Sequence, residues 1–253
     1  MAWDIRRCDE VDSTNNVCKT LAAQGADNTA VIARRQTAGK GRLGRSFLSP
    51  EGGLYLSVLW RGCPAGQLLT VTPLAAVAVC RAIEQTCGAV CGIKWCNDVV
   101  LNGKKLCGIL TESSLRPDGG AEWLVVGIGV NVDLREDELP VPHATSLALA
   151  GASNLDRTKL AAALLDALDR RERQWRFDRE AMMADYRATC LTLGTLVRVE
   201  LPGGGELVGE AVDILDDGEL VVRDDAGENR AVTAGDVRHL RAVDGGYAGE
   251  ASK

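Results

Sequence analysis

The sequence has no run of apolar residues long enough to cross a membrane. The longest runs lie around positions 74–80 and 123–128, far below the roughly 18 residues that a membrane-spanning helix needs. The first seven residues contain Asp4, Arg6 and Arg7 and lack the apolar stretch of a signal peptide. We therefore expect a cytoplasmic protein that does not act at a membrane.

Histidine is scarce, and the cysteines do not pair by spacing. His143 and His239 are the only histidines, and the nine cysteines are odd in number and scattered along the chain. Cys87 and Cys91 lie close in sequence, but no second close pair follows them, which disfavours a structural zinc site. In a chain without a signal peptide, reduced thiols are the expected state.

The chain also lacks an excess of positive charge. It has 29 Lys and Arg against 35 Asp and Glu, a net charge of −6, which disfavours binding to DNA or to an anionic membrane. The charge is uneven, because 13 acidic and only 5 basic residues lie from Glu200 onward. A site for an anion is therefore expected in the first 199 residues.

What is present indicates one large globular domain and a small second one. The 253 residues are 46% apolar and 25% charged, as in ordinary soluble proteins. Periodicity predicts strands at 3–11, 29–34, 54–60, 93–95, 98–101, 105–113 and 121–132. Helices are expected after the cap at 12–14, ending before Gly25, and at 67–87, 156–175 and 179–190. Asn102-Gly103 predicts a type I′ hairpin turn.

From Gly194 the pattern changes to short strands separated by turns rich in Gly and Asp. The strands are expected at 197–201, 207–214, 219–223 and 229–233, which is typical of a small β-barrel. We place the domains at 1–191 and 194–242, followed by a disordered tail at 243–253.

A glycine-rich basic segment occupies the predicted loop at 37–53. Gly39-Lys40-Gly41-Arg42-Leu43-Gly44 matches G-x-G-x-x-G, but no helix start and no suitably placed acidic residue follow, which disfavours a dinucleotide fold. No Walker A motif occurs in the chain. Five basic residues and no acidic one lie between 28 and 50. The loop could cradle an anion, or it could be a solvated, mobile surface loop.

The segment 94–98 leads into the predicted hairpin, and Lys105 lies in the strand that follows the hairpin turn. Strand alternation predicts Lys105 and Cys107 on one face and Leu106 on the other. A lysine between apolar strand residues suggests an anion partner, although lysines near a hairpin tip also serve solubility. Asn97 and Asp98 could equally cap a turn, and an asparagine also ends the strand at 121–132.

Taken together, these segments resemble the biotin–protein ligase family over residues 4–190. The matching pieces occur in the family's order: Asp12-Ser13-Thr14-Asn15, Gln36-Thr37-Ala38-Gly39-Lys40-Gly41-Arg42-Leu43-Gly44-Arg45, Leu54-Tyr55-Leu56-Ser57, Lys94-Trp95-Cys96-Asn97-Asp98, Lys105-Leu106-Cys107-Gly108-Ile109-Leu110 and Gly127-Ile128-Gly129-Val130-Asn131. The β-rich tail is similar to the family's SH3-like C-terminal domain.

The resemblance implies an α/β (α+β) catalytic domain with a mixed sheet, of the class II synthetase-like type. It implies that biotin and MgATP give biotinyl-5′-AMP, from which a lysine of a biotin carboxyl carrier domain, in acetyl-CoA carboxylase or a related carboxylase, takes the biotinyl group. ATP and Mg²⁺ are the implied cofactors, with no dedicated protein metal site. A homodimer is compatible with the resemblance.

The resemblance also assigns roles to individual residues. The implied biotin-binding residues are Ser13, Thr14, Asn15, Gln36, Lys40, Gly41, Arg42, Lys105 and Gly108. The implied nucleotide-binding residues are Arg42, Arg45, Phe47, Asn97 and Asn131. Arg42, Lys105 and Asp98 are the implied catalytic residues, with Asp98 orienting the metal, Lys105 or the incoming amine.

Three positions depart from the family pattern. Lys40 and Leu43 stand where arginine is frequent, and Cys96 replaces the usual proline. A lysine gives a point charge in place of a planar fork, which is expected to weaken retention of the adenylate.

Only 11 residues precede Asp12, which leaves no room for the winged-helix DNA-binding domain of some family members, so we expect a ligase that is not a repressor. Two alternatives remain open: a lipoate or octanoate ligase or transferase on the same fold, and a non-catalytic module that binds biotin or nucleotide.

Overall fold

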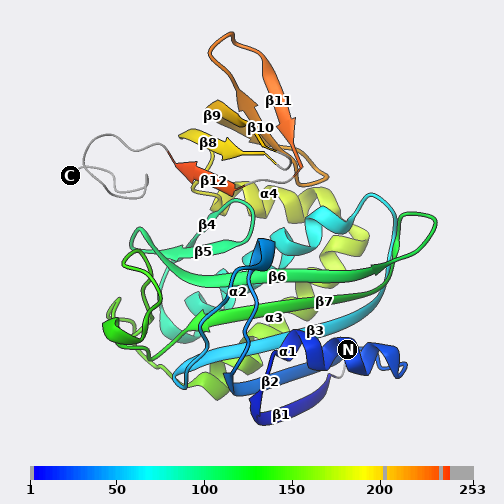
Figure 1. Cartoon of the computed structure of the whole chain (residues 1–253), viewed down its shortest axis with the longest axis vertical. Coiled ribbons are helices and arrows are strands. Elements are labelled where there is room, and N and C mark those ends of the chain that lie inside the picture. The colour runs from blue at the N-terminus through cyan, green and yellow to red at the C-terminus, as the bar shows by residue number, and fades with distance from the viewer. Residues whose placement is uncertain (1–2, 202–203, 234–235, 240–253) are drawn as a thin grey trace.

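A seven-stranded mixed sheet is the frame of the larger part of the protein (Figure 1). The computed structural model describes residues 3–201, 204–233 and 236–239. The strand order is β1 (Asp4–Val11), β2 (Thr29–Gln36), β3 (Gly53–Cys63), β7 (Ala121–Asn131), β6 (Lys104–Leu115), β5 (Asp98–Leu101) and β4 (Gly92–Lys94). β1 runs parallel to β2, and the other neighbouring pairs are antiparallel. The predicted α/β class with a mixed sheet is confirmed.

Helices cover both faces of this sheet. α2 (Val71–Cys87), α3 (Arg157–Phe177) and α4 (Arg179–Thr189) lie behind it in Figure 1, and α1 (Thr14–Ala23) packs on the opposite face. Residues next to each other on β3 show this, because Val58 belongs to the large core with α2 and α3 while Leu59 packs with Cys18 and Ala22 of α1. A strand covered on both faces is apolar throughout, which explains the continuous apolar run of β3.

The connections include three short 3₁₀ helices: η1 (Arg42–Gly44), η2 (Leu68–Thr70) and η3 (Glu136–Glu138). Within the described residues, one helical segment, Leu68–Cys87, is long and apolar enough to span a membrane by length and composition. In this protein 67% of that window is buried, because α2 fills the core between the sheet and α3.

A second, antiparallel sheet of five strands lies beyond α4 (Figure 1). Its order is β11 (Asn229–Val232), β10 (Leu220–Arg223), β9 (Glu206–Ile214), β8 (Leu196–Glu200) and β12 (Asp236–His239). The sequence predicted the first four, and β12 was missed. The tail expected at 243–253 lies outside the described residues.

The turn between β9 and β10 contacts the larger part of the chain directly. The indole Nε1 of Trp95 donates a hydrogen bond to the carbonyl of Gly218 at 3.1 Å, and Arg187 of α4 forms an ion pair with Asp216. Gly218 has φ of +97°, and a Cβ at this position would lie 3.1 Å from the carbonyl oxygen of Leu69. The small sheet therefore lies against the segment that contains residues 94–98.

The hairpin between β5 and β6 turns as predicted, but the strand alternation after it was wrong. Asn102 and Gly103 have φ of +50° and +69°, as a type I′ turn requires. Val99 then opposes Cys107 while Val100 opposes Lys105, so Leu106 has no partner residue. This β-bulge changes the alternation: Leu106 and Cys107 are both buried in the core, and Lys105 lies with Gly108 in the pocket described next.

Candidate functional site

A polar pocket opens on the face of the sheet that carries α1. Its walls come from the start of α1, the basic loop at 37–52, the start of β5, and the middle of β6 and β7. The cavity has a volume of about 140 Å³. The lining residues are Ser13, Thr14, Asn15, Gln36, Lys40, Gly41, Arg42, Arg45, Ser46, Phe47, Asn97, Asp98, Lys105, Gly108, Ile109, Leu110, Gly127, Ile128 and Gly129.

The predicted site residues, with one exception, line this pocket. The exception is Asn131, at the end of β7, whose side chain is 6% exposed and donates a hydrogen bond to the carbonyl of Thr145 at 2.9 Å. In this structure Asn131 therefore anchors the segment that follows β7. The resemblance alone had suggested a nucleotide contact for this residue.

The basic loop is folded, which a glycine-rich composition alone does not reveal. The backbone N–H of Gly41 donates to the carbonyl of Arg45 at 2.7 Å, and that of Phe47 donates to Gly39 at 2.9 Å. These bonds form a small hairpin whose tip holds Leu43 and Gly44 at φ of +54° and +73°. The loop therefore forms a wall of the pocket with a turn of its own, as a loop that cradles an anion requires.

One end of the pocket is a chain of hydrogen bonds among uncharged side chains. The hydroxyl of Thr14 donates to Gln36 Oε1 at 3.0 Å, and the Thr14 backbone N–H reaches the same oxygen at 2.8 Å. Ser57 of β3 contacts both Thr14 Oγ1, at 2.7 Å, and Asn15 Oδ1, at 2.6 Å. Gln36 Nε2 donates to Ser49. The side-chain orientations at this end are therefore fixed before a ligand arrives.

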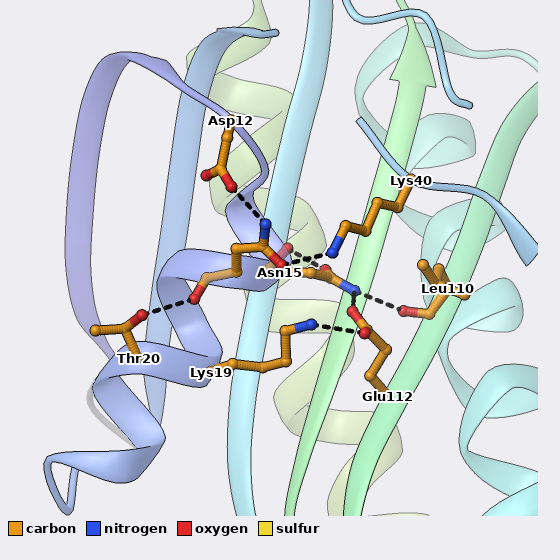
Figure 2. A network of polar contacts seen from close by, with 9 residues as sticks. Asp12, Asn15, Lys19, Thr20, Lys40, Leu110 and Glu112 are labelled. Carbon is orange, nitrogen blue, oxygen red and sulfur yellow. Dashed lines mark hydrogen bonds and ion pairs between the residues drawn. The ribbon is translucent and has the colours of Figure 1, made fainter. Parts of the chain in front are cut away.

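Ser57, Glu112 and Lys19 are partners of the site to which the sequence assigned no role, although Ser57 stands in the matching segment 54–57. Asn15 Nδ2 donates to Glu112 Oε2 at 2.8 Å, and Lys19 Nζ lies 2.7 Å from Glu112 Oε1 (Figure 2). A serine inside the apolar strand 54–60 and an acidic residue inside β6 were the available signals. The local pattern does not connect these residues, and only the packing of α1 on the sheet joins them.

The other end of the pocket is cationic. Arg42 Nη1 donates to Cys96 Sγ at 3.0 Å and to Asn97 Oδ1 at 3.3 Å. Lys105 Nζ lies 2.7 Å from Asp98 Oδ1, with both side chains less than one third exposed. Neighbouring residues of one short segment therefore hold the two cations on the same wall, where an anion would meet both charges.

Lys40 connects the basic loop to α1. Its Nζ donates to Asn16 Oδ1 at 2.8 Å, and Asn16 in turn donates to the carboxylate of Asp12. Figure 2 shows Lys40 reaching from the loop toward α1. In the structure this lysine fixes the loop against the start of α1.

Glycines on β6 and β7 make room for two pocket side chains. A Cβ on Gly129 would lie 2.4 Å from the Phe47 ring, and one on Gly108 would lie 3.0 Å from it. A Cβ on Gly127 would lie 2.1 Å from Asn15 Oδ1. Gly108 and Gly129 oppose each other across the two strands, so the Phe47 ring rests on a flat floor that any larger residue would disturb.

None of the nine cysteines forms a disulfide. Burial raises the pKa of Cys18 and of Cys91 to about 12, so these thiols are protonated near neutral pH and unreactive. Cys96 is half-buried beside Arg42. Among the described residues, no group of three or more His, Cys, Asp or Glu gathers as a metal site.

Family models match both parts of the chain. The Biotin/lipoate A/B protein ligase family matches residues 8–131, and the Biotin protein ligase C terminal domain matches residues 192–240. The first match contains the pocket, and the second contains the small sheet.

Individual relatives agree with these matches. The biotin–[acetyl-CoA-carboxylase] ligase of Mycobacterium tuberculosis is 40% identical over 249 residues, covering 92% of this chain and 87% of the relative. The bifunctional ligase/repressor BirA of Bacillus spizizenii is 34% identical, covering 89% and 71%.

A solved structure extends the similarity to three dimensions. The biotin protein ligase of Aquifex aeolicus in complex with biotin and ATP superimposes with a TM-score of 0.79 at 29% identity, covering 94% of this chain and 99% of that one. Given the order of the motifs, the fold, and a relative that is similar over nearly its whole length, the chain belongs to the biotin–protein ligase family.

Proposed function

We propose that this protein is a biotin–protein ligase that activates biotin with MgATP and transfers it to a lysine of a biotin carboxyl carrier domain. In the first step the biotin carboxylate attacks the α-phosphorus of ATP and pyrophosphate leaves. In the second step the lysine amine attacks the acyl carbon and AMP leaves. The observation that carries the proposal is the presence of Arg42 and Lys105 on one wall of a pocket whose other end is uncharged and polar.

The first step needs such an arrangement of charge. A carboxylate and a phosphate repel each other, and they approach only where cations neutralise both. Arg42 and Lys105 supply those cations, and neither step needs a nucleophile from the protein. The Lys105–Asp98 ion pair keeps the ammonium group at the wall of the pocket, and the ammonium group has further N–H donors for an arriving anion.

We assign the two ends of the pocket to the two substrates. The uncharged end, with Ser13, Thr14, Asn15 and Gln36, would hold the biotin head group, and Lys40, Gly41 and Gly108 would flank the chain to its carboxylate. Arg42, Arg45 and Asn97 would face the nucleotide, and the Phe47 ring would cover the adenine. Because Phe47 now rests on Gly108 and Gly129, nucleotide binding would require this ring to move.

Magnesium would enter with the phosphates of ATP and supply Lewis-acid charge there. Asp98 is the carboxylate at the cationic wall, and its pairing with Lys105 supports the role of orienting that lysine. Its other two candidate roles, toward the metal and toward the incoming amine, stay predictions, as does the nucleotide contact of Asn131.

The remaining proposals concern the setting in which the enzyme works. We propose a carrier domain as macromolecular partner, a cytoplasmic location, no binding to DNA or membranes, no repressor activity, and domains at 1–191 and 194–242. The net charge of −6 supports the absence of DNA binding. A homodimer remains a prediction for the purified protein, to be checked by sedimentation.

Pyrophosphate exchange with each candidate acid tests the reaction. Biotin is expected to drive exchange and to yield biotinyl-5′-AMP by mass analysis, and a purified carrier domain is expected to accept the biotinyl group. Exchange driven by lipoate or octanoate in place of biotin would establish the alternative ligase. Binding of biotin without exchange or transfer would establish the non-catalytic module.

A further inference from the structure

Glu112 does not line the pocket, but it contacts a residue of the end that we assign to biotin. It stands on β6, where Oε2 accepts a hydrogen bond from Asn15 Nδ2 at 2.8 Å and Oε1 lies 2.7 Å from Lys19 Nζ. The second hydrogen of Asn15 Nδ2 points to the carbonyl of Leu110 at 3.3 Å. Figure 2 shows the Asn15 amide between these groups.

The charge of Glu112 decides which way the Asn15 amide faces. Burial of the carboxyl opposes its ionisation, but hydrogen bonds from Lys19 and Asn15 outweigh that effect and hold the pKa of Glu112 below its ordinary value. An ionised carboxylate only accepts hydrogen bonds, and the Leu110 carbonyl also only accepts. The NH₂ group of Asn15 must therefore face these two, which turns Oδ1 toward Ser57 and the pocket.

On that side the pocket contains a chain of hydroxyl and amide oxygens. Three oxygen–oxygen contacts follow one another: Asn15 Oδ1 to Ser57 Oγ at 2.6 Å, Ser57 Oγ to Thr14 Oγ1 at 2.7 Å, and Thr14 Oγ1 to Gln36 Oε1 at 3.0 Å. With Thr14 donating to Gln36 Oε1 and Ser57 donating to Asn15 Oδ1, each amide oxygen has a donor, and an amide oxygen accepts up to two hydrogen bonds. Asn15 Oδ1 therefore keeps a second lone pair, and a group that enters the pocket can donate to it.

Resting on the proposed function, we propose that Glu112 is a positioning residue that sets the specificity of the biotin end: by holding the Asn15 amide in one orientation, it makes the pocket present Oδ1 as an acceptor for a ligand N–H. The ureido ring of biotin carries two N–H groups. The head groups of lipoate and octanoate carry none and leave the second lone pair of Oδ1 without a donor, which disfavours them in a buried polar site.

The decisive comparison uses biotin and its two cyclic carbamate isosteres, in each of which one ureido N–H is replaced by a ring oxygen. Dissociation constants are measured by calorimetry for the wild type and for Glu112→Gln. We expect the wild type to bind one isostere at least tenfold more weakly than biotin. A glutamine can donate as well as accept, so the Asn15 amide is then held in one orientation only by its contact with the Leu110 carbonyl at 3.3 Å, and the preference for biotin over that isostere should fall at least fivefold.

Two further variants separate orientation from charge and packing. Lys19→Met leaves the carboxylate as acceptor, so its preference should stay within twofold of the wild type. Glu122→Gln is the matched control, because Glu122 is an exposed partner of Arg61 on the neighbouring strand β7; its preference should not change. A fall in Lys19→Met equal to that in Glu112→Gln would overturn the proposal.

The wild type alone also decides the matter if Glu112→Gln does not fold, as judged by circular dichroism. Equal binding of biotin and both isosteres to the wild type would overturn the proposal without any variant. An unchanged preference in a folded Glu112→Gln protein would do so as well. These outcomes are distinct from failure of the proposed function, which would appear as a wild-type protein that makes no biotinyl-5′-AMP.

Discussion

Lys105 and Asp98 form an ion pair at the wall of the pocket, with 2.7 Å between Nζ and Oδ1. A β-bulge at Leu106 turns Lys105 to this side of the sheet. The ammonium group is therefore held in place before any substrate binds. This pre-organisation reduces the rearrangement that accompanies the charge build-up of the reaction.

The two pocket cations should be needed for the first step. We expect Arg42→Ala and Lys105→Ala each to slow formation of biotinyl-5′-AMP at least 10-fold, through loss of about 1.5–3 kcal/mol of charge-assisted contact. Pyrophosphate exchange measures the rate. Arg116→Ala removes an exposed arginine paired with Asp118 and serves as control. Near-wild-type exchange in both pocket variants would refute these roles.

Substitution of two strand glycines should affect the KM of one substrate each. Gly127→Ala places a Cβ against Asn15 and should raise the KM for biotin at least tenfold, with a small effect on the KM for ATP. Gly129→Ala places a Cβ against the Phe47 ring and should raise the KM for ATP instead. Initial rates with each substrate varied provide the comparison. If both variants affected the same substrate, the assignment of the two ends would be wrong.

Biotin affinity should depend on pH through Glu112. Its pKa is lowered in the folded protein, so the carboxylate orients Asn15 at neutral pH and this contribution is lost as the pH falls below about 4.5 and through the folded value. Lys19 and Lys40 are the cations that face it. We expect weaker binding of biotin at acid pH in the wild type and a flatter dependence in Glu112→Gln, both measured by calorimetry in the range where the fold is intact.

Cys96 should be among the first cysteines that an alkylating reagent modifies. At neutral pH, iodoacetamide is expected to label the half-buried Cys96 and Cys8 before Cys18 and Cys91, whose pKa values are about 12. Alkylation at Cys96 should slow adenylate formation, because Arg42 donates to its sulfur. Peptide mass mapping identifies the labelled sites, and Cys8→Ser provides the control. Full activity after complete labelling of Cys96 would contradict this expectation.

The small sheet should support the reaction through Trp95. Trp95→Phe removes the indole donor to Gly218 and should cost about 1–3 kcal/mol of stability, together with part of the adenylation rate. Trp175→Phe is a matched control, because its indole donates to Thr70 at a buried position outside the pocket. Thermal unfolding should show a loss in both variants, and pyrophosphate exchange should fall only in the first. An equal loss of rate in both would remove any special role for the Gly218 contact.

The amino-acid sequence alone specified most elements of the fold and the residue types of the candidate site. Apolar periodicity located the helices and most strands, and Asn102-Gly103 specified its hairpin because few residues tolerate positive φ. The motifs contained nearly every residue that lines the pocket. Glycines that allow a close approach and cations that attract an anion are needed at particular positions of a short segment, so they are visible in the sequence. The strand β12 was missed because its short segment has no clear alternation.

The tertiary structure decided which of these residues meet. The bulge at Leu106 separated Lys105 from Cys107, which strand alternation had placed on one face, because one extra residue shifts the two-residue period of a strand. Asn131 is directed to Thr145 by the segment that follows β7. Glu112 and Ser57 join the site only through the packing of α1 on β3 and β6, contacts between residues far apart in sequence that local pattern cannot encode.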